Sequence, residues 1–103
     1  MESITPQDLR LRIERGETIT VIDIREAYEY EDGHLGGLNI PIADIPARID
    51  EIRALAERGA IVVHCRSGSR SAMAYKMLTV QYKLPNVLNL VGGYEGWEKD
   101  LAG

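Results

Sequence analysis

The sequence predicts a three-layer α/β/α domain built on a parallel sheet. Short apolar runs rich in β-branched residues, such as 19–24 and 60–64, alternate with longer amphipathic stretches along the whole chain. Strands that alternate with helices favour a parallel sheet with helices packed on both of its faces. The chain has 103 residues, of which 45% are hydrophobic and 27% charged, and this size and composition suit one domain over residues 1–103.

The first half of the chain begins with a helix. Thr5 is its expected N-cap, Pro6 fits the first helical turn, and Gly16 ends it, with Leu9 and Ile13 on the apolar face. The other elements of this half are short, and they are a buried strand at 19–24, an acidic helix at 27–31 that ends at Gly33, and a strand at 38–40 before Pro41.

The second half repeats the alternation with clearer periods. Apolar residues at helical spacing predict a helix over 45–57, and the most apolar run, 60–64, predicts a central strand. A strand at 87–91 and a helix at 94–101 follow near the end. Between them lies a helix over 71–83, whose expected buried side chains are Ala72, Met73, Met77 and Leu78.

Charge and cysteine content exclude several classes of protein. Twelve Lys and Arg against sixteen Asp and Glu give a net charge of −4, which argues against a nucleic-acid binder. A single cysteine and two histidines leave no disulfide framework and no metal-ligand cluster, so we expect neither metal nor cofactor. No apolar run approaches the roughly 20 residues that span a bilayer. The N-terminus does not look like a signal peptide, so we expect a cytoplasmic location and no membrane partner.

One segment carries the chemistry, and it begins with the only cysteine. Cys65 ends the central strand, and the loop that follows consists of small and basic residues before the next helix begins, namely Arg66, Ser67, Gly68, Ser69, Arg70 and Ser71. Small residues let the backbone curl so that successive N–H groups point inward, and the positive end of the following helix adds to this anion-binding nest. The loop therefore predicts a site for an anionic sulfur or oxygen group beside Cys65.

The same surroundings predict a reactive thiol. A helix N-terminus and two cationic neighbours lower the pKa of a cysteine, and the thiolate is the nucleophilic form. The alternative interpretation is a small buried hydrophobe, which is the ordinary role of a free cysteine at a strand end. The glycine–serine loop, the two arginines and the helix together favour the reactive role.

Polar residues also stand at the end of the neighbouring strand, at the same edge of the sheet. We expect Asp23, Arg25 and Glu26 to brace the cysteine loop through hydrogen bonds and charge pairs, although they would also suit a cap on the turn after their strand. We expect Arg66 and Arg70 to orient an anionic substrate. Their alternatives are a solvated rim or a pair with Glu26.

Three segments resemble parts of the rhodanese (sulfurtransferase) domains, in the same order along the chain. Residues 65–71 resemble the active-site loop of that family, and residues 23–26, with 33–34 and 39–41, resemble its first signature. Residues 90–97 resemble its C-terminal Gly-Gly…Trp element. The resemblance implies a five-stranded parallel sheet in the order 1-5-4-2-3, with a very short first strand at Ser3–Ile4. Residues 33–38 depart from the family by lacking a proline in this loop.

The resemblance implies a single-domain thiosulfate sulfurtransferase. In such an enzyme a sulfane sulfur passes from thiosulfate or another small anionic donor to Cys65, as a persulfide, and then to cyanide, a thiol or a protein acceptor. The loop from Cys65 to Arg70 has six residues, one fewer than in the related cysteine-dependent phosphatases, which disfavours a phosphatase or an arsenate reductase. A non-enzymatic persulfide carrier that docks on another protein is the remaining alternative.

Overall fold

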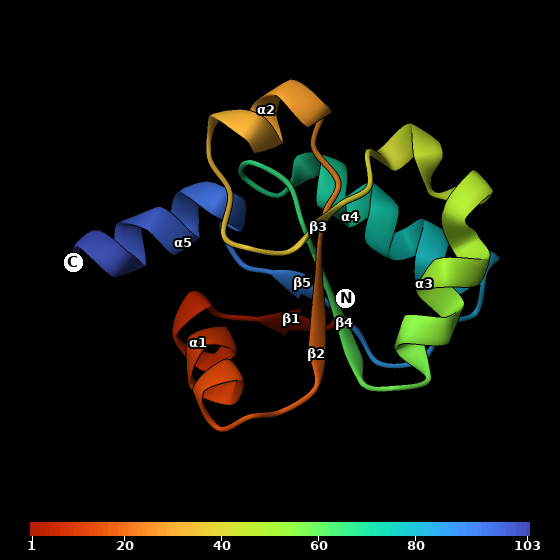
Figure 1. The fold of residues 1–103 in the computed structure, drawn as a ribbon, viewed down its shortest axis with the longest axis horizontal. Helices are drawn as coiled ribbons and strands as arrows, with labels where there is room; N and C mark the ends of the chain where they lie inside the picture. Colours follow the sequence, from red (N-terminus) through yellow and green to blue (C-terminus); the bar gives the residue numbers. More distant parts are fainter.

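The computed structural model describes residues 1–103 and contains one five-stranded parallel sheet (Figure 1). Its strand order is β1-β5-β4-β2-β3, which confirms both the predicted α/β layering and the order that the resemblance implied. The strands are short, and they are β1 (Ser3–Ile4), β2 (Ile19–Asp23), β3 (Leu38–Asn39), β4 (Ala60–His64) and β5 (Val87–Leu90). None of the helices combines the length and the apolar composition that crossing a bilayer requires.

Helices cover both faces of the sheet, and the central strand β4 serves both. Ile61 and Val63 lie in the larger core, against α3 (Ile49–Ala56) and α4 (Ser69–Lys76). Val62 points to the other face and packs in the smaller core, with α1 (Pro6–Glu14) and α5 (Gly93–Ala102). This alternation follows from the two-residue period of a strand.

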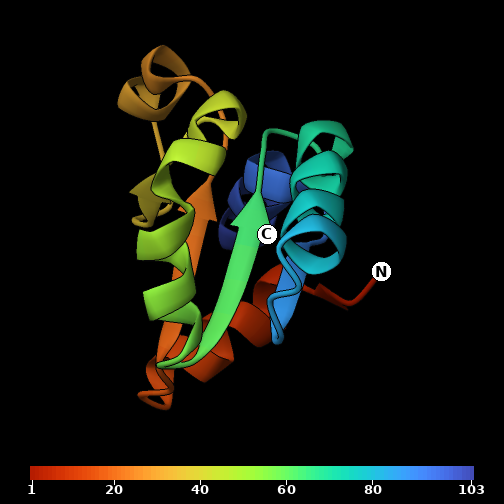
Figure 2. The same ribbon diagram turned by 90° about the vertical axis from the view of Figure 1, so that its right-hand side faces the viewer.

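Strands β2 and β4 place the two polar segments side by side. They run in the same direction, and Asp23 is the register partner of His64. The amide of Ile24 donates to the carbonyl of His64 at 3.0 Å, so the chain leaves both strands at one edge. Beyond that edge lies α2 (Ala27–Asp32), as Figure 2 shows. The carboxyl edge of the sheet is where parallel α/β folds place their sites.

Helix α3 begins later than its periodicity predicts. The segment before it forms two 3₁₀ turns, Ile42–Asp44 and Pro46–Arg48, and the α-helix starts at Ile49 rather than at Ile45. Pro46 has no amide hydrogen, so it opens a new turn instead of continuing one. Ile45 is nevertheless fully buried, because the 3₁₀ turns direct it into the larger core.

The buried faces of two helices differ from the prediction. Met73 is 65% exposed, whereas Ala74 and Leu78 are buried, so the expected burial of Met73 is wrong. In α1 the side chain of Ile13 is exposed and only Pro6 and Leu9 are buried. Each helix buries one stripe of side chains against the sheet. In these two helices the orientation of the helix on the sheet decides which residues form that stripe, and apolar residues outside it stay exposed.

Candidate active site

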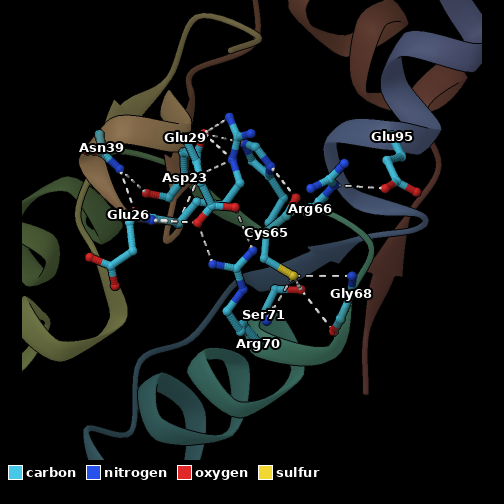
Figure 3. A network of polar contacts seen from close by, with 12 residues as sticks. Asp23, Glu26, Glu29, Asn39, Cys65, Arg66, Gly68, Arg70, Ser71 and Glu95 are labelled. Atoms are coloured by element: carbon cyan, nitrogen blue, oxygen red, sulfur yellow. Dashed lines mark hydrogen bonds and ion pairs between the residues drawn. The ribbon is translucent and has the colours of Figure 1, made fainter. Parts of the chain in front are cut away.

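The thiol of Cys65 lies inside the loop that follows β4 (Figure 3). Cys65 is only 1% exposed. The amides of Gly68 and Ser71 donate to its Sγ at 3.1 and 3.3 Å, and the Ser71 hydroxyl oxygen lies 3.5 Å from it. The sulfur thus faces inward-pointing amides, as the composition of the loop predicts.

These contacts determine the charge on the sulfur. Burial by itself raises the pKa of the Cys65 thiol. The Ser71 hydroxyl and the amides of Ser71, Gly68 and Ser67 act in the opposite direction, and together they hold the pKa below its ordinary value. A neutral thiol can donate to the Ser71 oxygen, and in the thiolate form the same hydroxyl can turn its hydrogen to the sulfur. The arrangement therefore favours the nucleophilic anion.

The start of α4 leaves further donors free beside the sulfur. Gly68, the residue before the helix, has a φ of 134°, a conformation that L side chains rarely adopt. This turn brings the first helical residues over Cys65. The amides of Ser69 and Arg70 hydrogen-bond no carbonyl of the chain. Such free amides and the positive end of the helix suit a second anionic atom bonded to Sγ.

The N-terminus of α5 supports the loop from behind. The amides of Tyr94 and Glu95 donate to the carbonyls of Cys65 and Arg66 at 2.9 and 3.0 Å. Gly93 stands at a φ of 58°, and a Cβ there would lie 2.6 Å from the Cys65 carbonyl oxygen. The two segments approach closely only because residue 93 has no side chain.

Asp23 and Arg25 form a buried ion pair beside the loop. Arg25 donates to both carboxylate oxygens of Asp23, its Nη2 reaching Oδ2 at 2.7 Å, and both residues are at most 4% exposed. The same guanidinium donates to the Gly33 carbonyl at 2.8 Å and lies over the Tyr94 ring. The pair thus ties β2 to the loop after α2 and to α5, and it makes no contact with Sγ.

The two arginines of the loop are paired with carboxylates. Arg70 makes two bonds to Glu29, at 2.7 and 3.0 Å, and its guanidinium lowers the pKa of Glu29 to about 2. Arg66 is exposed and pairs with Glu95 at 3.0 Å. Glu26 pairs with neither arginine. It caps α2 together with Glu29, and in Figure 3 its carboxylate points away from the sulfur.

His64 lies behind the cysteine on the opposite face of β4. It is fully buried, and burial lowers its pKa. Its Nδ1 lies 3.1 Å from the Cys65 carbonyl oxygen, which can only accept, so Nδ1 carries the proton. The neutral ring packs in the core and does not contact the thiol.

The sequence does not predict the contacts that several supporting residues make. Glu29 and Glu95 are acidic residues on helices, where most acids are simply solvated. Asn39 donates to the carbonyls of Asp23 and Arg25 at 3.1 and 3.0 Å, yet it reads as part of a short strand. Asn39 and Glu95 do lie in segments that resemble family motifs, as Gly93 does, but the resemblance does not indicate these contacts, and Glu29 lies in no such segment.

An open cleft borders the cysteine loop between α2 and α5. Its volume is about 510 Å³, and Arg66 is the loop residue in its wall. The other lining residues come from the turn after β2 and from the two helices and their ends, and they are Arg25, Tyr28, Glu29, Asp32, Gly33, Tyr94, Glu95 and Glu98. The cleft is large enough for a molecule several times the size of one small anion.

Comparison with known proteins identifies similar chains. The rhodanese-like domain family matches residues 5–100. A sulfurtransferase of Allochromatium vinosum is 33% identical over 96% of this chain and 90% of its own length. A putative sulfur carrier protein of Bacillus subtilis is 30% identical over 91% of this chain, which spans only 49% of that protein.

Solved structures agree with the fold. A rhodanese-related protein from Thermoplasma volcanium superposes with a TM-score of 0.83 at 30% identity, covering 97% of this chain and 93% of its own. A Rhodopseudomonas palustris protein described as a possible tyrosine phosphatase has a TM-score of 0.84 at 27% identity, covering 100% of this chain and 83% of its own. Both likenesses cover nearly the whole of this chain.

Proposed function

Because the chain belongs to the rhodanese-like domain family, we propose that it is a sulfurtransferase that carries a sulfane sulfur as a persulfide on Cys65. One observation supports this above all: the amides of Gly68 and Ser71 donate to Sγ and lower its pKa. The proposal treats residues 1–103 as one catalytic domain. It needs no cofactor or metal, and it places the protein in the reducing cytoplasm, where a lone thiol stays reduced.

The first half-reaction loads the cysteine. The Cys65 thiolate attacks the outer sulfur of a donor such as thiosulfate, and a new sulfur–sulfur bond forms at Sγ. The bond between the two donor sulfurs breaks, and sulfite leaves with its electron pair. The negative charge then resides on the outer persulfide sulfur, where the free amides of Ser69 and Arg70 can stabilise it.

The second half-reaction transfers the sulfur from Cys65 to an acceptor. A thiolate or cyanide attacks the outer sulfur of the persulfide, and Cys65 leaves as the thiolate with which the cycle began. The hydrogen bonds at Sγ stabilise this leaving group as well as the attacking nucleophile. One preformed ring of donors therefore serves both steps.

The position of Arg70 argues against a phosphatase. A cysteine-dependent phosphatase needs a guanidinium turned toward the substrate phosphate beside the thiolate. Here both terminal nitrogens of Arg70 are bonded to Glu29. The cradle that remains consists mainly of backbone amides and suits a single sulfur atom.

Intact-mass analysis tests the proposal. The protein is incubated with thiosulfate, freed of donor, and weighed before and after cyanide is added. We expect the mass of one sulfur atom to appear, to be lost to cyanide as thiocyanate, and to be absent in Cys65→Ser. Ser69→Ala is the matched control, because its hydroxyl makes no bond to the sulfur. Release of phosphate from an aryl phosphate without thiocyanate would overturn the proposal in favour of a phosphatase, and a persulfide that no acceptor removes would indicate a carrier.

A further inference from the structure

The cleft that borders the cysteine loop at Arg66 carries more negative than positive charge. Four carboxylates and two guanidinium groups line it. Arg25 is neutralised by Asp23, and Arg66 by Glu95. Arg70, the other cation of the loop, is neutralised by Glu29. No arginine of the site therefore offers an unpaired positive charge to a ligand.

Two of the lining carboxylates, in contrast, have no cationic partner. Asp32 at the end of α2 and Glu98 on α5 are exposed and form no ion pair. Burial raises the pKa of Tyr94, another lining residue, and the neighbouring Glu98 carboxylate raises it further. The unpaired charge that a ligand meets on entering the cleft is negative.

The size of the cleft suits an occupant larger than a small ion. A volume of about 510 Å³ lies in the range that accommodates a drug-sized ligand or a few residues of peptide. Thiosulfate and cyanide are both much smaller than this, and as anions neither is the kind of ligand that Asp32 and Glu98 would attract. The aromatic side chain of Tyr28 at the rim is 72% exposed, and an exposed aromatic next to a carboxylate suits a lysine or arginine side chain.

We propose that the cleft receives a basic peptide segment of a partner protein, whose cysteine exchanges sulfur with Cys65. This rests on the proposed function, since it names the partner of the same thiol. The segment lies between α2 and α5, with its positive side chains near Asp32 and Glu98. Its thiolate attacks the outer sulfur of the Cys65 persulfide, so the partner leaves with the persulfide and Cys65 returns to the thiolate.

The test measures sulfur transfer to matched acceptors. Cys65 is first loaded with inorganic polysulfide and freed of donor, and loading is verified by mass. Second-order rate constants are then measured for a pentapeptide with cysteine flanked by lysines, for the same peptide with glutamates, and for cysteamine as a small cationic thiol. We expect the lysine peptide to react fastest per thiolate. The ratio of the rate constants for the two peptides is then compared between protein variants, because the intrinsic reactivity of each thiol is the same for every variant and cancels.

The decisive variant is Asp32→Asn with Glu98→Gln, which removes both unpaired charges and leaves the residues that bond to the loop unchanged. We expect the ratio of the lysine-peptide to the glutamate-peptide rate constant to fall roughly three- to tenfold. The control is Glu17→Gln with Glu57→Gln, two exposed acids near the other edge of the sheet that make the same change in net charge. It should keep the wild-type ratio.

The remaining outcomes are distinct. An unchanged ratio in the cleft variant, or an equal fall in the control, would overturn the assignment of a basic partner. If the rate constant for cysteamine falls in the cleft variant as much as that for the lysine peptide, the proposal of a peptide partner is wrong and a small aminothiol is favoured. Absence of a persulfide before any acceptor is added would instead overturn the proposed function, and this assignment with it.

Discussion

Replacing Ser71 with alanine tests how the loop activates Cys65. The Ser71 hydroxyl is fully buried and lies 3.5 Å from Sγ, and it also donates to the Gly68 carbonyl at 3.1 Å. In Ser71→Ala the amide of residue 71 still donates to the sulfur. The Gly68 carbonyl keeps the amide of Ala72 as a donor, so no buried acceptor is left without a partner. The variant therefore removes the contacts of the hydroxyl with the sulfur and with this carbonyl, and it leaves each of these groups another donor.

The expected size of the effect follows from that contact. A hydrogen bond to a charged group is worth about 1.5–3 kcal/mol, and the long distance places this one near the lower bound. About 1.4 kcal/mol corresponds to a factor of ten in an equilibrium. We therefore expect the thiolate fraction of Cys65 to fall roughly tenfold at any pH well below its pKa, and to recover when the pH is raised.

The assay is the pH dependence of alkylation by iodoacetamide. In Ser71→Ala the rate profile should move to higher pH and reach the same plateau, because the intrinsic reactivity of the thiolate changes little. Ser69→Ala is the control in the same loop and should follow the wild-type profile. Superimposable profiles for Ser71→Ala and wild type would refute the reasoning that the hydroxyl stabilises the anion, and so would an equal displacement in Ser69→Ala.

Three further changes probe the scaffold. Gly93→Ala sets a methyl group against the Cys65 carbonyl and should cost about 2–4 kcal/mol, seen as a lower Tm; an unchanged Tm would contradict the close approach. Asp23→Asn leaves the guanidinium of Arg25 buried without its charge partner and should cost about 3–5 kcal/mol in urea unfolding; adding Arg25→Met should recover part of it, and no recovery would argue against the pair. The pKa of Glu29 is about 2 in the folded chain against an ordinary 4.5, so its ion pair stabilises the protein above pH 4.5 and this stability is lost as the pH falls toward 2. The difference in unfolding free energy between wild type and Glu29→Gln should therefore vanish over that window, and a constant difference would contradict it.

The position and surroundings of the thiol depend largely on residues that are close to it in the sequence. The apolar run 60–64, the small residues of 67–69 and the helix after them are neighbours in the chain, so the strand, the turn and the inward amides follow from local geometry. The structure places Gly68 and Ser71 against the sulfur as expected. Periodicity likewise predicts the alternation of strands and helices, since each element must bury one stripe.

The ion pairs of the site and the buried faces of the helices depend on contacts between segments that are distant in the sequence. Arg70 pairs with Glu29, 41 residues away. The pair forms because α2 lies beyond the carboxyl edge of the sheet, next to the cysteine loop (Figure 2). The orientation of α4 on the sheet likewise leaves Met73 exposed.

By itself, then, the sequence determines a parallel α/β fold and a cysteine in an anion-binding loop, because strand periodicity, turn chemistry and helix starts act over a few residues. Only the tertiary structure decides which carboxylate neutralises each arginine, and hence the net sign of charge in the cleft. An ion pair depends on where two helices come to rest across the sheet, and no local pattern encodes that distance.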